Sequence, residues 1–321
     1  MQTPQTKDPE QNHLLALGTS SDYRGRFAPS PSGALHFGSL IAALASYIDA
    51  KAHHGKWLVR MEDIDTPRVV RGAADDILAT LEAFGLYWDE EVVYQSQRHS
   101  LYQDVLTDLM STSDVYACTC TRKQIKQRGG FYDNYCRASQ NQFEHNALRL
   151  KQNFPVYQFE DALQGRVSIP DLIAQEDYIV KRRDGLYAYQ LVVVVDDIEQ
   201  KISHVVRGAD LLEPTARQLS LFNQLNATPP SYLHVPLAVA EPGFKLSKQN
   251  HAPAIDNKMP LPALKAALSF LGFDLNALNQ IDDIADMLQW ATSTYRRNIL
   301  PPNREIQVQQ RSPLEYQFKP L

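Results

Sequence analysis

Two short polar segments, far apart in the chain, carry residue types that suit phosphate binding. The first, His36-Phe-Gly38-Ser39, leads into apolar residues that recur three and four positions apart, as on the buried face of a helix. At a helix start, unpaired backbone N–H groups and the helix dipole favour an anion. An imidazole there can donate to phosphate, and a glycine lets a ligand approach the backbone. The second, Lys245-Leu-Ser247-Lys248, places two lysines around a serine in a loop. Taken singly, the segments equally suit a surface histidine and solvated lysines.

The three cysteines of the chain form a second chemical feature. Cys118, Cys120 and Cys136 lie within nineteen residues of one another. Thiolates grouped on both sides of a bend suit a tetrahedral zinc ion that serves structure rather than catalysis. The fourth position is open to a water or to a nitrogen or oxygen ligand, and the candidates nearby are Tyr132, Tyr135 and, less favoured, His145. The alternative is a set of small buried or free cysteines.

The elements around the first phosphate segment predict a parallel sheet. Residues 23–27 and 57–61 have strand patterns, and residues 40–52 between them have a helical one. Ligands of such sheets bind beyond the carboxyl ends of the strands, where the His36 segment lies. Glu62 and two aspartates directly follow the second strand, and a carboxylate there could hold the ammonium group of an amino acid. The alternative is that these carboxylates form a solvated acidic turn. For the two aspartates the sequence supports both interpretations equally.

The second half of the chain predicts further strands of the same sheet. The run of valines within residues 186–197 predicts a strand covered on both faces. Residues 205–210 predict a strand end, residues 215–225 a helix, and residues 234–240 a final strand that enters the lysine loop. Residues 261–271 and 281–295 have helical patterns, followed by a polar tail interrupted by prolines.

Composition places the chain among ordinary soluble globular proteins. It has 321 residues, of which 44% are hydrophobic and 21% charged, and its net charge is −5. No apolar run approaches the ~20 residues that span a bilayer, and the first twenty residues are polar, which predicts a cytoplasmic protein. A local basic strip is enough to meet nucleic-acid phosphates. The candidates, which also suit a solvated face, are Arg122, Lys123, Lys126, Arg128 and Arg137.

The two phosphate segments, in this order and at this separation, resemble the "HIGH" and "KMSKS" signatures of class I aminoacyl-tRNA synthetases. The segment Arg60-Met-Glu62-Asp63-Ile-Asp65 is similar to the glutamyl branch of that family. The resemblance runs from about Tyr23 to Gln249 and is strongest to the shortened glutamyl-queuosine tRNA(Asp) synthetases. About seventy residues follow Asn250, too few for the large anticodon-binding region of a full glutamyl-tRNA synthetase. The cysteines also match that family's C-x-C-x11-Y-x3-C arrangement, which implies Tyr132 as the fourth zinc ligand.

The resemblance implies an activity and a set of site residues. Glutamate and ATP would give glutamyl adenylate without tRNA, and glutamate would then pass to queuosine in the anticodon loop of tRNA(Asp). The enzyme would act as a monomer with one structural Zn²⁺, and with Mg²⁺ bound to ATP by unassigned carboxylates. The implied catalytic residues are His36, Gly38, Lys245 and Lys248; those for ATP are His36, Gly38, Ser39, Ser247 and Lys248; and those for glutamate are Arg26, Phe27, Ala28, Pro29, Ser30, Glu62, Tyr189 and Arg207.

Other interpretations stay open on the sequence. Without the family, Tyr189 is a core aromatic and Arg207 pairs with a neighbouring aspartate. The chain departs from the family pattern at Phe37, Ser39, Leu246 and Gln249, but these changes remove no imidazole or ammonium group. Two rival functions are a conventional glutamyl-tRNA synthetase module whose anticodon region is encoded elsewhere, and a non-catalytic RNA-binding paralogue.

The predicted architecture is α/β, with a Rossmann-type parallel sheet. We expect a disordered tail at residues 1–22, a nucleotide-binding domain in two halves at residues 23–110 and 186–250, a zinc-binding, acceptor-type insertion at residues 111–185, and a short helical C-terminal region at residues 251–321.

Overall fold

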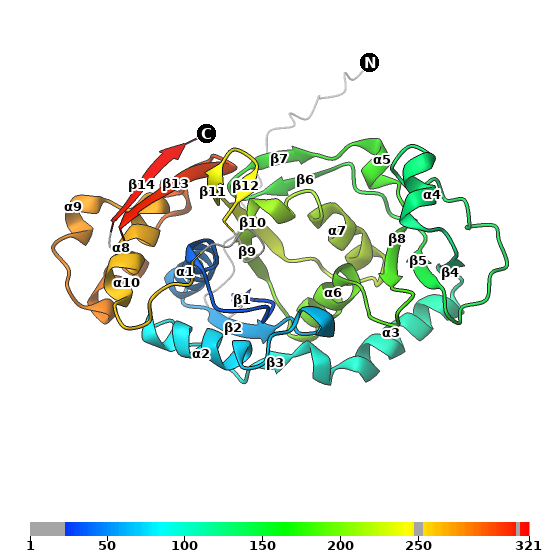
Figure 1. Cartoon of the computed structure of the whole chain (residues 1–321), viewed down its shortest axis with the longest axis horizontal. Coiled ribbons are helices and arrows are strands. Elements are labelled where there is room, and N and C mark those ends of the chain that lie inside the picture. Colours follow the sequence, from blue (N-terminus) through cyan, green and yellow to red (C-terminus); the bar gives the residue numbers. More distant parts are fainter. Residues whose placement is uncertain (1–22, 247–252, 313–314, 321) are drawn as a thin grey trace, which may run out of the picture.

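The computed structural model describes residues 23–246, 253–312 and 315–320. The insertion lies at one end of an elongated molecule and the C-terminal region at the other, with the parallel strands between them (Figure 1). The predicted tail at residues 1–22 lies outside the described residues. No helix in the described ranges is long and apolar enough to cross a membrane.

The predicted parallel βαβ unit is confirmed. Strand β1 (Arg24–Phe27) pairs in parallel with β2 (Lys56–Met61), and β2 pairs in parallel with the short β3 (Val93–Tyr94). Helix α1 (Phe37–Ala52) connects β1 to β2 and buries Leu40, Leu44 and Ile48. Two further helices follow, α2 (Ala73–Ala83) and α3 (His99–Ser111).

The second half continues the parallel arrangement beside β1. Strand β9 (His204–Gly208) pairs in parallel with β10 (Ser231–Val235), and helix α7 (Thr215–Gln224) connects them. The backbone N–H of Ser203, next to β9, donates to the carbonyl of Arg24 in β1 at 3.0 Å. Both strand pairs therefore present their carboxyl ends on the same side.

The strand predicted from the run of valines is wrong, because these residues form helix α6 (Tyr189–Glu199). The helix packs against α3, α7 and strand β8 (Tyr178–Lys181), and every residue from Leu191 to Asp197 is buried. A helix buried on all sides has no polar stripe, so periodicity cannot distinguish it from a covered strand. The preference of valine for strands is weak enough for tertiary packing to override it.

The insertion is built around a small antiparallel sheet. Its strands are β4 (Val115–Cys118), β5 (Ala147–Leu150) and β8, in the order β4-β5-β8. A separate hairpin, β6 (Gln158–Asp161) and β7 (Gly165–Ser168), runs back toward β10 (Figure 1). Two short helices, α4 (Arg122–Gln127) and α5 (Asp171–Ala174), complete it.

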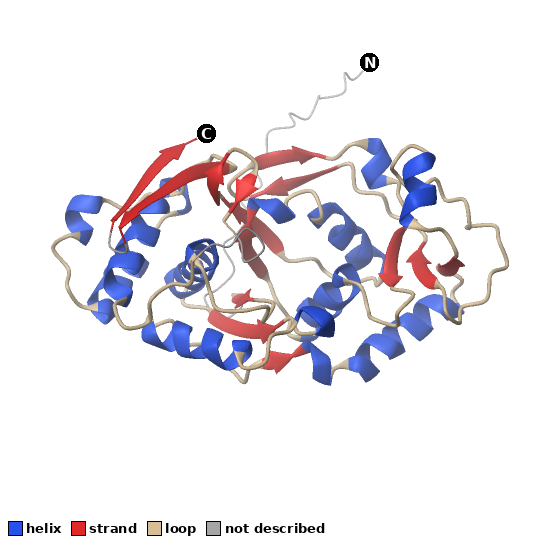
Figure 2. Cartoon of the chain, in the orientation of Figure 1, coloured by secondary structure: helices blue, strands red, loops and turns tan. Residues whose placement is uncertain are grey.

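The C-terminal region is only partly helical, which corrects the predicted polar tail. Its helices are α8 (Pro260–Phe270), α9 (Leu275–Leu278) and α10 (Ile284–Thr294), but its end forms the hairpin β13 (Glu305–Ser312) and β14 (Glu315–Pro320). Figure 2 shows this hairpin as two long strands beside the helices.

The hairpin joins the lysine loop to the C-terminal region. Strand β11 (Leu237–Glu241) pairs with β12 (Phe244–Lys245) on one side and with β13 on the other. The single strand predicted at residues 234–240 is therefore two strands, β10 and β11, which separate at Pro236. Proline lacks the N–H that a continuous ladder needs.

A buried charge fixes the C-terminal region to α1. The carboxylate of Asp49, on the inner face of α1, accepts from Arg297 Nε at 2.8 Å, Arg297 Nη2 at 2.9 Å and Tyr295 Oη at 3.0 Å. A buried carboxylate is tolerated only when such partners replace water. The C-terminal region thus packs on α1 of the first half instead of forming a separate unit.

Candidate active site

The first phosphate segment lies where the sequence predicts it, at the start of α1. His36 is the N-cap of the helix, and its Nδ1 accepts a hydrogen bond from the backbone N–H of Ser39 at 3.3 Å. Gly38 has almost no spare room, because a Cβ there would stand 3.3 Å from the carbonyl oxygen of Leu246. Leu246 belongs to the lysine loop, so the two segments are in contact although about two hundred residues separate them.

The chain on the far side of the lysine loop also returns to the first segment. The backbone N–H of Ile255 donates to the carbonyl of Leu35 at 3.0 Å, and Ala254 forms an antiparallel bridge with His36. Both described flanks of the loop therefore adjoin the start of α1. The predicted ATP-binding residues Ser247 and Lys248 lie outside the described residues, as does Gln249.

Lys245, the other predicted lysine, lies at the end of β12. Its ammonium group forms an ion pair with Asp210, a half-exposed residue just beyond β9. This places Lys245 at the carboxyl end of the parallel strands, on the same side as the start of α1.

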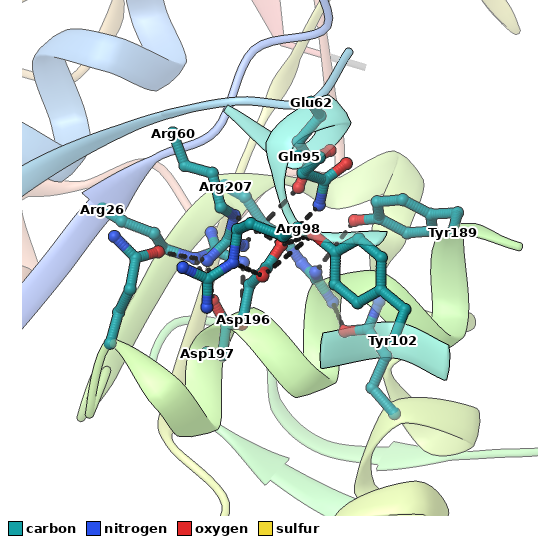
Figure 3. A network of polar contacts seen from close by, with 12 residues as sticks. Arg26, Arg60, Glu62, Gln95, Arg98, Tyr102, Tyr189, Asp196, Asp197 and Arg207 are labelled. Atoms are coloured by element: carbon teal, nitrogen blue, oxygen red, sulfur yellow. Dashed lines mark hydrogen bonds and ion pairs between the residues drawn. The ribbon is translucent and has the colours of Figure 1, made fainter. Parts of the chain in front are cut away.

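The four charged or phenolic residues predicted for glutamate come from four elements and converge at the carboxyl ends of the strands. Arg26 comes from β1, Glu62 follows β2, Tyr189 starts α6 and Arg207 comes from β9 (Figure 3). Arg26 pairs with Asp197 of α6, with Nε 3.2 Å and Nη2 3.3 Å from its carboxylate. Arg207 Nη1 donates to the Tyr189 hydroxyl at 3.5 Å.

Glu62 carries one of the buried polar atoms of this region that lack a hydrogen-bond partner in the described part of the chain. Its Oε1 is buried and accepts no hydrogen bond from the described residues, while Arg60 Nη2 is 3.5 Å away. Burial raises the pKa of Glu62 to about 7, against the opposing effect of Arg60 and Arg26. A positively charged group bound here would supply the missing donors and favour the carboxylate.

The remaining residues predicted for glutamate form the segment after β1. The Phe27 side chain packs on Trp57 in the core, with ring centroids 6.3 Å apart, so only its backbone can line the pocket. The carbonyl of Pro29 accepts from the backbone N–H of Glu62 at 2.9 Å, which joins this segment to the end of β2. Ala28 and Ser30 lie on either side of Pro29 in the same loop.

A layer of buried charges beneath the pocket was not predicted from the sequence. Arg60 is fully buried and donates from Nη1 to Asp197 Oδ1 and to Gln200 Oε1, both at 2.8 Å. Asp196 accepts from Gln95 Nε2, Arg98 Nε and the Tyr102 hydroxyl at 2.8–2.9 Å (Figure 3). The sequence did contain a signal for this layer, namely two aspartates inside an apolar run. Carboxylates in such a run are buried, and a buried carboxylate requires hydrogen-bond partners from other elements.

The cysteines come together in the insertion as predicted. The Sγ atoms of Cys118, Cys120 and Cys136 all lie within 4.8 Å of one another, and among the described residues these form the group suited to a metal ion. Tyr132 is buried beside them, and its hydroxyl accepts from the Cys136 backbone N–H at 2.9 Å. Tyr135 is 65% exposed, so Tyr132 is the better-placed oxygen ligand. Three sulfurs and one phenolic oxygen fit a closed tetrahedral site.

The basic residues of the insertion are partly engaged in structural contacts. Arg128 Nη2 lies 3.1 Å from the Cys120 sulfur, and its guanidinium covers the Tyr135 ring at 4.5 Å. Arg137 pairs with the buried Asp177 at 2.9 Å. Arg122, Lys123 and Lys126 lie on α4, and all three are exposed.

Comparisons with known proteins indicate the family and the fold of the chain. Residues 22–281 match the family model "tRNA synthetases class I (E and Q), catalytic domain". The Glutamyl-Q tRNA(Asp) synthetase of Photobacterium profundum is 57% identical over 90% of this chain and 94% of its own, and that of Vibrio vulnificus (strain YJ016) 52% over the same shares. A crystal structure of a glutamate tRNA ligase from Elizabethkingia meningosepticum superposes with a TM-score of 0.72 at 24% identity.

The structural match covers 87% of this chain but 66% of the longer ligase, and it supports the fold. Family membership rests on the sequence matches, and the family model spans the start of α1, the residues predicted for glutamate and the cysteine cluster. The chain therefore belongs to the class I tRNA synthetases (E and Q), as a ligase of the glutamyl-Q tRNA(Asp) synthetase family.

Proposed function

We propose that this protein activates glutamate with ATP in the absence of tRNA and then transfers the glutamate to queuosine in the anticodon loop of tRNA(Asp). The observation that carries the proposal is the buried Glu62 carboxylate, which lacks a hydrogen-bond donor at Oε1 and shares a pocket with Arg207 and Arg26. An amino acid that carries an ammonium group and two carboxylates is complementary to this set of charges.

In the first step the α-carboxylate of glutamate attacks the α-phosphorus of ATP in line. The new bond is a mixed anhydride, the bond to the β-phosphate breaks, and pyrophosphate leaves. The protein contributes orientation and charge neutralisation. Glu62 would hold the ammonium group and Arg26 and Arg207 the carboxylates. His36, the N–H groups at Gly38 and Ser39, Ser247, and the lysines Lys245 and Lys248 would meet the phosphates.

In the second step the modified base attacks the activated carbonyl, and AMP leaves. The choice of acceptor rests on the relatives, whose name specifies tRNA(Asp) and whose length this chain matches at 94%. We further propose a monomeric enzyme of the cytoplasm that uses ATP as its Mg²⁺ complex, with no carboxylate assigned to the metal.

We also propose that Cys118, Cys120, Cys136 and Tyr132 bind one structural Zn²⁺. Four protein ligands leave no open coordination position, so the ion would hold the loops around α4 together and take no part in the reaction. The support is the clustering of three sulfurs within 4.8 Å beside a buried phenol.

Glutamate-dependent ATP–pyrophosphate exchange without RNA tests the first step. We expect exchange with glutamate and none with aspartate or glutamine. The second step is tested by the transfer of labelled glutamate to tRNA(Asp) with and without queuosine, and to tRNA(Glu). Charging of tRNA(Glu) at its 3′ end would support a conventional synthetase, and the absence of exchange would support an RNA-binding paralogue.

A further inference from the structure

Arg207 is held by a set of hydrogen-bond acceptors on the side away from the pocket. Its Nη2 donates to Thr215 Oγ1 at 2.7 Å and to Gln218 Oε1 at 2.8 Å, and its Nε donates to His234 Nε2 at 3.1 Å. Nη1 remains, and it points toward the Tyr189 hydroxyl in the glutamate pocket (Figure 3). The orientation of the guanidinium therefore depends on groups that do not themselves reach the substrate.

His234 can accept this hydrogen bond in only one tautomer. Its ring is fully buried in β10, and Nδ1 lies 2.6 Å from Asp161 Oδ2. An ionised carboxylate can only accept, so the imidazole proton belongs on Nδ1. Nε2 then carries the lone pair that faces Arg207, whose Nε is always a donor. Burial and the charge of Arg207 lower the pKa of His234, whereas Asp161 opposes them, and the net direction favours the neutral ring.

Asp161 is itself fixed, although it belongs to the insertion. It lies at the turn of the β6–β7 hairpin, where Oδ1 accepts from the backbone N–H groups of Leu163 at 3.0 Å and Gln164 at 2.9 Å. The hairpin is attached to β10 by a hydrogen bond from Ala162 N to Tyr232 O at 2.9 Å. The insertion thus supplies a carboxylate to the floor of the amino-acid site.

We propose that Asp161 and His234 are positioning residues for the glutamate-binding guanidinium: Asp161 fixes the His234 tautomer, and His234 Nε2 fixes the orientation of Arg207. The inference rests on the proposed function, in which Arg207 holds a substrate carboxylate. It adds a dependence of glutamate binding on the insertion, through a contact remote from the cysteine cluster. Without the acceptor at Nε, the guanidinium can rotate, and Nη1 then no longer points toward the bound substrate.

Two near-isosteric variants separate positioning from general stability. His234→Asn retains a donor toward Asp161 but has no atom at the position of Nε2. His234→Gln places an amide oxygen within reach of Arg207 but loses the Asp161 contact. In the exchange assay we expect His234→Asn to raise the KM for glutamate by about 10- to 100-fold, with the KM for ATP unchanged. In His234→Gln the rise in the glutamate KM should be at most half as large as in His234→Asn, on a logarithmic scale.

Asp161→Asn provides an independent arm. An asparagine amide can donate to Nδ1, and the ring proton would then move to Nε2. The Nε2–H and the Arg207 Nε–H would both be donors and would face each other without an acceptor. We therefore expect a glutamate KM at least as high as in His234→Asn. Equal glutamate KM values in all three variants and the wild type would overturn the proposal, as would an equal rise in the KM values for glutamate and ATP.

The tautomer can also be measured without any substitution. Imidazole ¹⁵N NMR of the wild-type protein should show a neutral His234 protonated at Nδ1, and a proton on Nε2 would contradict the proposal. If instead the wild type shows no glutamate-dependent exchange, the proposed function fails while the tautomer measurement still stands. The two failures are therefore distinguishable.

Discussion

The cysteine cluster and the proposed glutamate pocket are built in opposite ways. The cluster takes Cys118, Cys120, Tyr132 and Cys136 from one short stretch of the insertion. The pocket takes its side chains from β1, β2, α6 and β9, between Arg26 and Arg207. The candidate ligands of the cluster are close in sequence, so their spacing can be read directly. The pocket exists only after the two halves of the domain have packed together.

The difference extends to what stabilises each region. The pocket rests on buried charges that neutralise one another, and removing one leaves its partner unpaired. The cluster lies in a segment with a small core of its own, where a metal ion would provide much of the stability. Damage to the cluster should therefore affect folding first, and damage to the pocket should affect substrate binding first.

The largest expected effect is loss of the metal. Cys136→Ser, or removal of zinc with a chelator, should lower the melting temperature by on the order of 10 °C, because the binding energy of a structural zinc ion is also folding energy. Calorimetry and metal analysis by mass spectrometry check this. Zinc returned to the chelated wild type should restore the melting temperature, whereas Ser139→Ala should leave it unchanged. If the wild type freed of metal has the same melting temperature as before, the cysteine cluster is not a structural metal site.

The pocket should respond in substrate binding instead. Glu62→Gln removes the negative charge but keeps the shape, and we expect the glutamate KM in the exchange assay to rise about 100-fold with little change in melting temperature. Asp63→Asn is the matched control, because Asp63 accepts hydrogen bonds from the backbone N–H of Ser96 at 2.8 Å and from its hydroxyl at 2.6 Å. A larger loss of glutamate affinity in the control would assign the ammonium contact to Asp63.

The pH dependence of the pocket follows from the raised pKa of Glu62, about 7. In the proposed reaction the Glu62 carboxylate holds the ammonium group of glutamate, so kcat/KM for glutamate should rise about tenfold per pH unit below that value and level off above it. In the free protein the folded state keeps a proton that the unfolded state loses near pH 4.5, so stability should fall as pH rises from 4.5 to about 7. Glu62→Gln should flatten both pH profiles. If the profiles keep their slopes in this variant, another group causes the pH dependence.

The same contrast explains how much of the molecule was predictable. The strands around α1 have local patterns, and the structure confirms them. Helix α6 (Tyr189–Glu199) was misassigned as a strand because a segment covered on all sides carries no periodicity. The hairpin β13–β14 was missed because its pairing with β11 is fixed by contacts about seventy residues away. Its strands also alternate with many polar side chains, as an exposed sheet face allows.

For the sites, the sequence indicated the residues better than their supports. The structure brings together Arg26, Glu62, Tyr189 and Arg207, which family resemblance had grouped. It also reveals Arg60, Asp196 and His234, whose positions beneath the pocket no local spacing could indicate. Supporting residues act through partners remote in sequence, so their importance is visible only in three dimensions.

The choice between the two tyrosines tests how far spacing alone can specify a ligand. Tyr132→Phe should weaken zinc binding about tenfold, because it removes the proposed oxygen ligand and leaves three sulfurs. Tyr135→Phe is the matched control and should have no effect, since that ring lies exposed beneath Arg128. Competition with a chromophoric chelator measures both affinities. An effect of Tyr135→Phe alone would mean that the loop rearranges around the metal.

The smallest expected effect concerns Phe37, where the chain departs from the aliphatic residue of the family pattern. Its ring stacks on Tyr316 of β14 with centroids 4.4 Å apart and meets Phe270 of α8 edge-on at 6.3 Å. The C-terminal hairpin therefore supports the start of α1, next to Gly38. Phe37→Ile should raise the KM for ATP by about two- to fivefold, with the glutamate KM unchanged. The substitution removes one aromatic pair, and with it about 1 kcal/mol of the packing energy that holds the start of α1 in place. In a double-mutant cycle with Tyr316→Leu the two substitutions should couple by a similar amount. If their effects on the KM for ATP are additive, the hairpin stabilises the fold without acting on the phosphate end of the site.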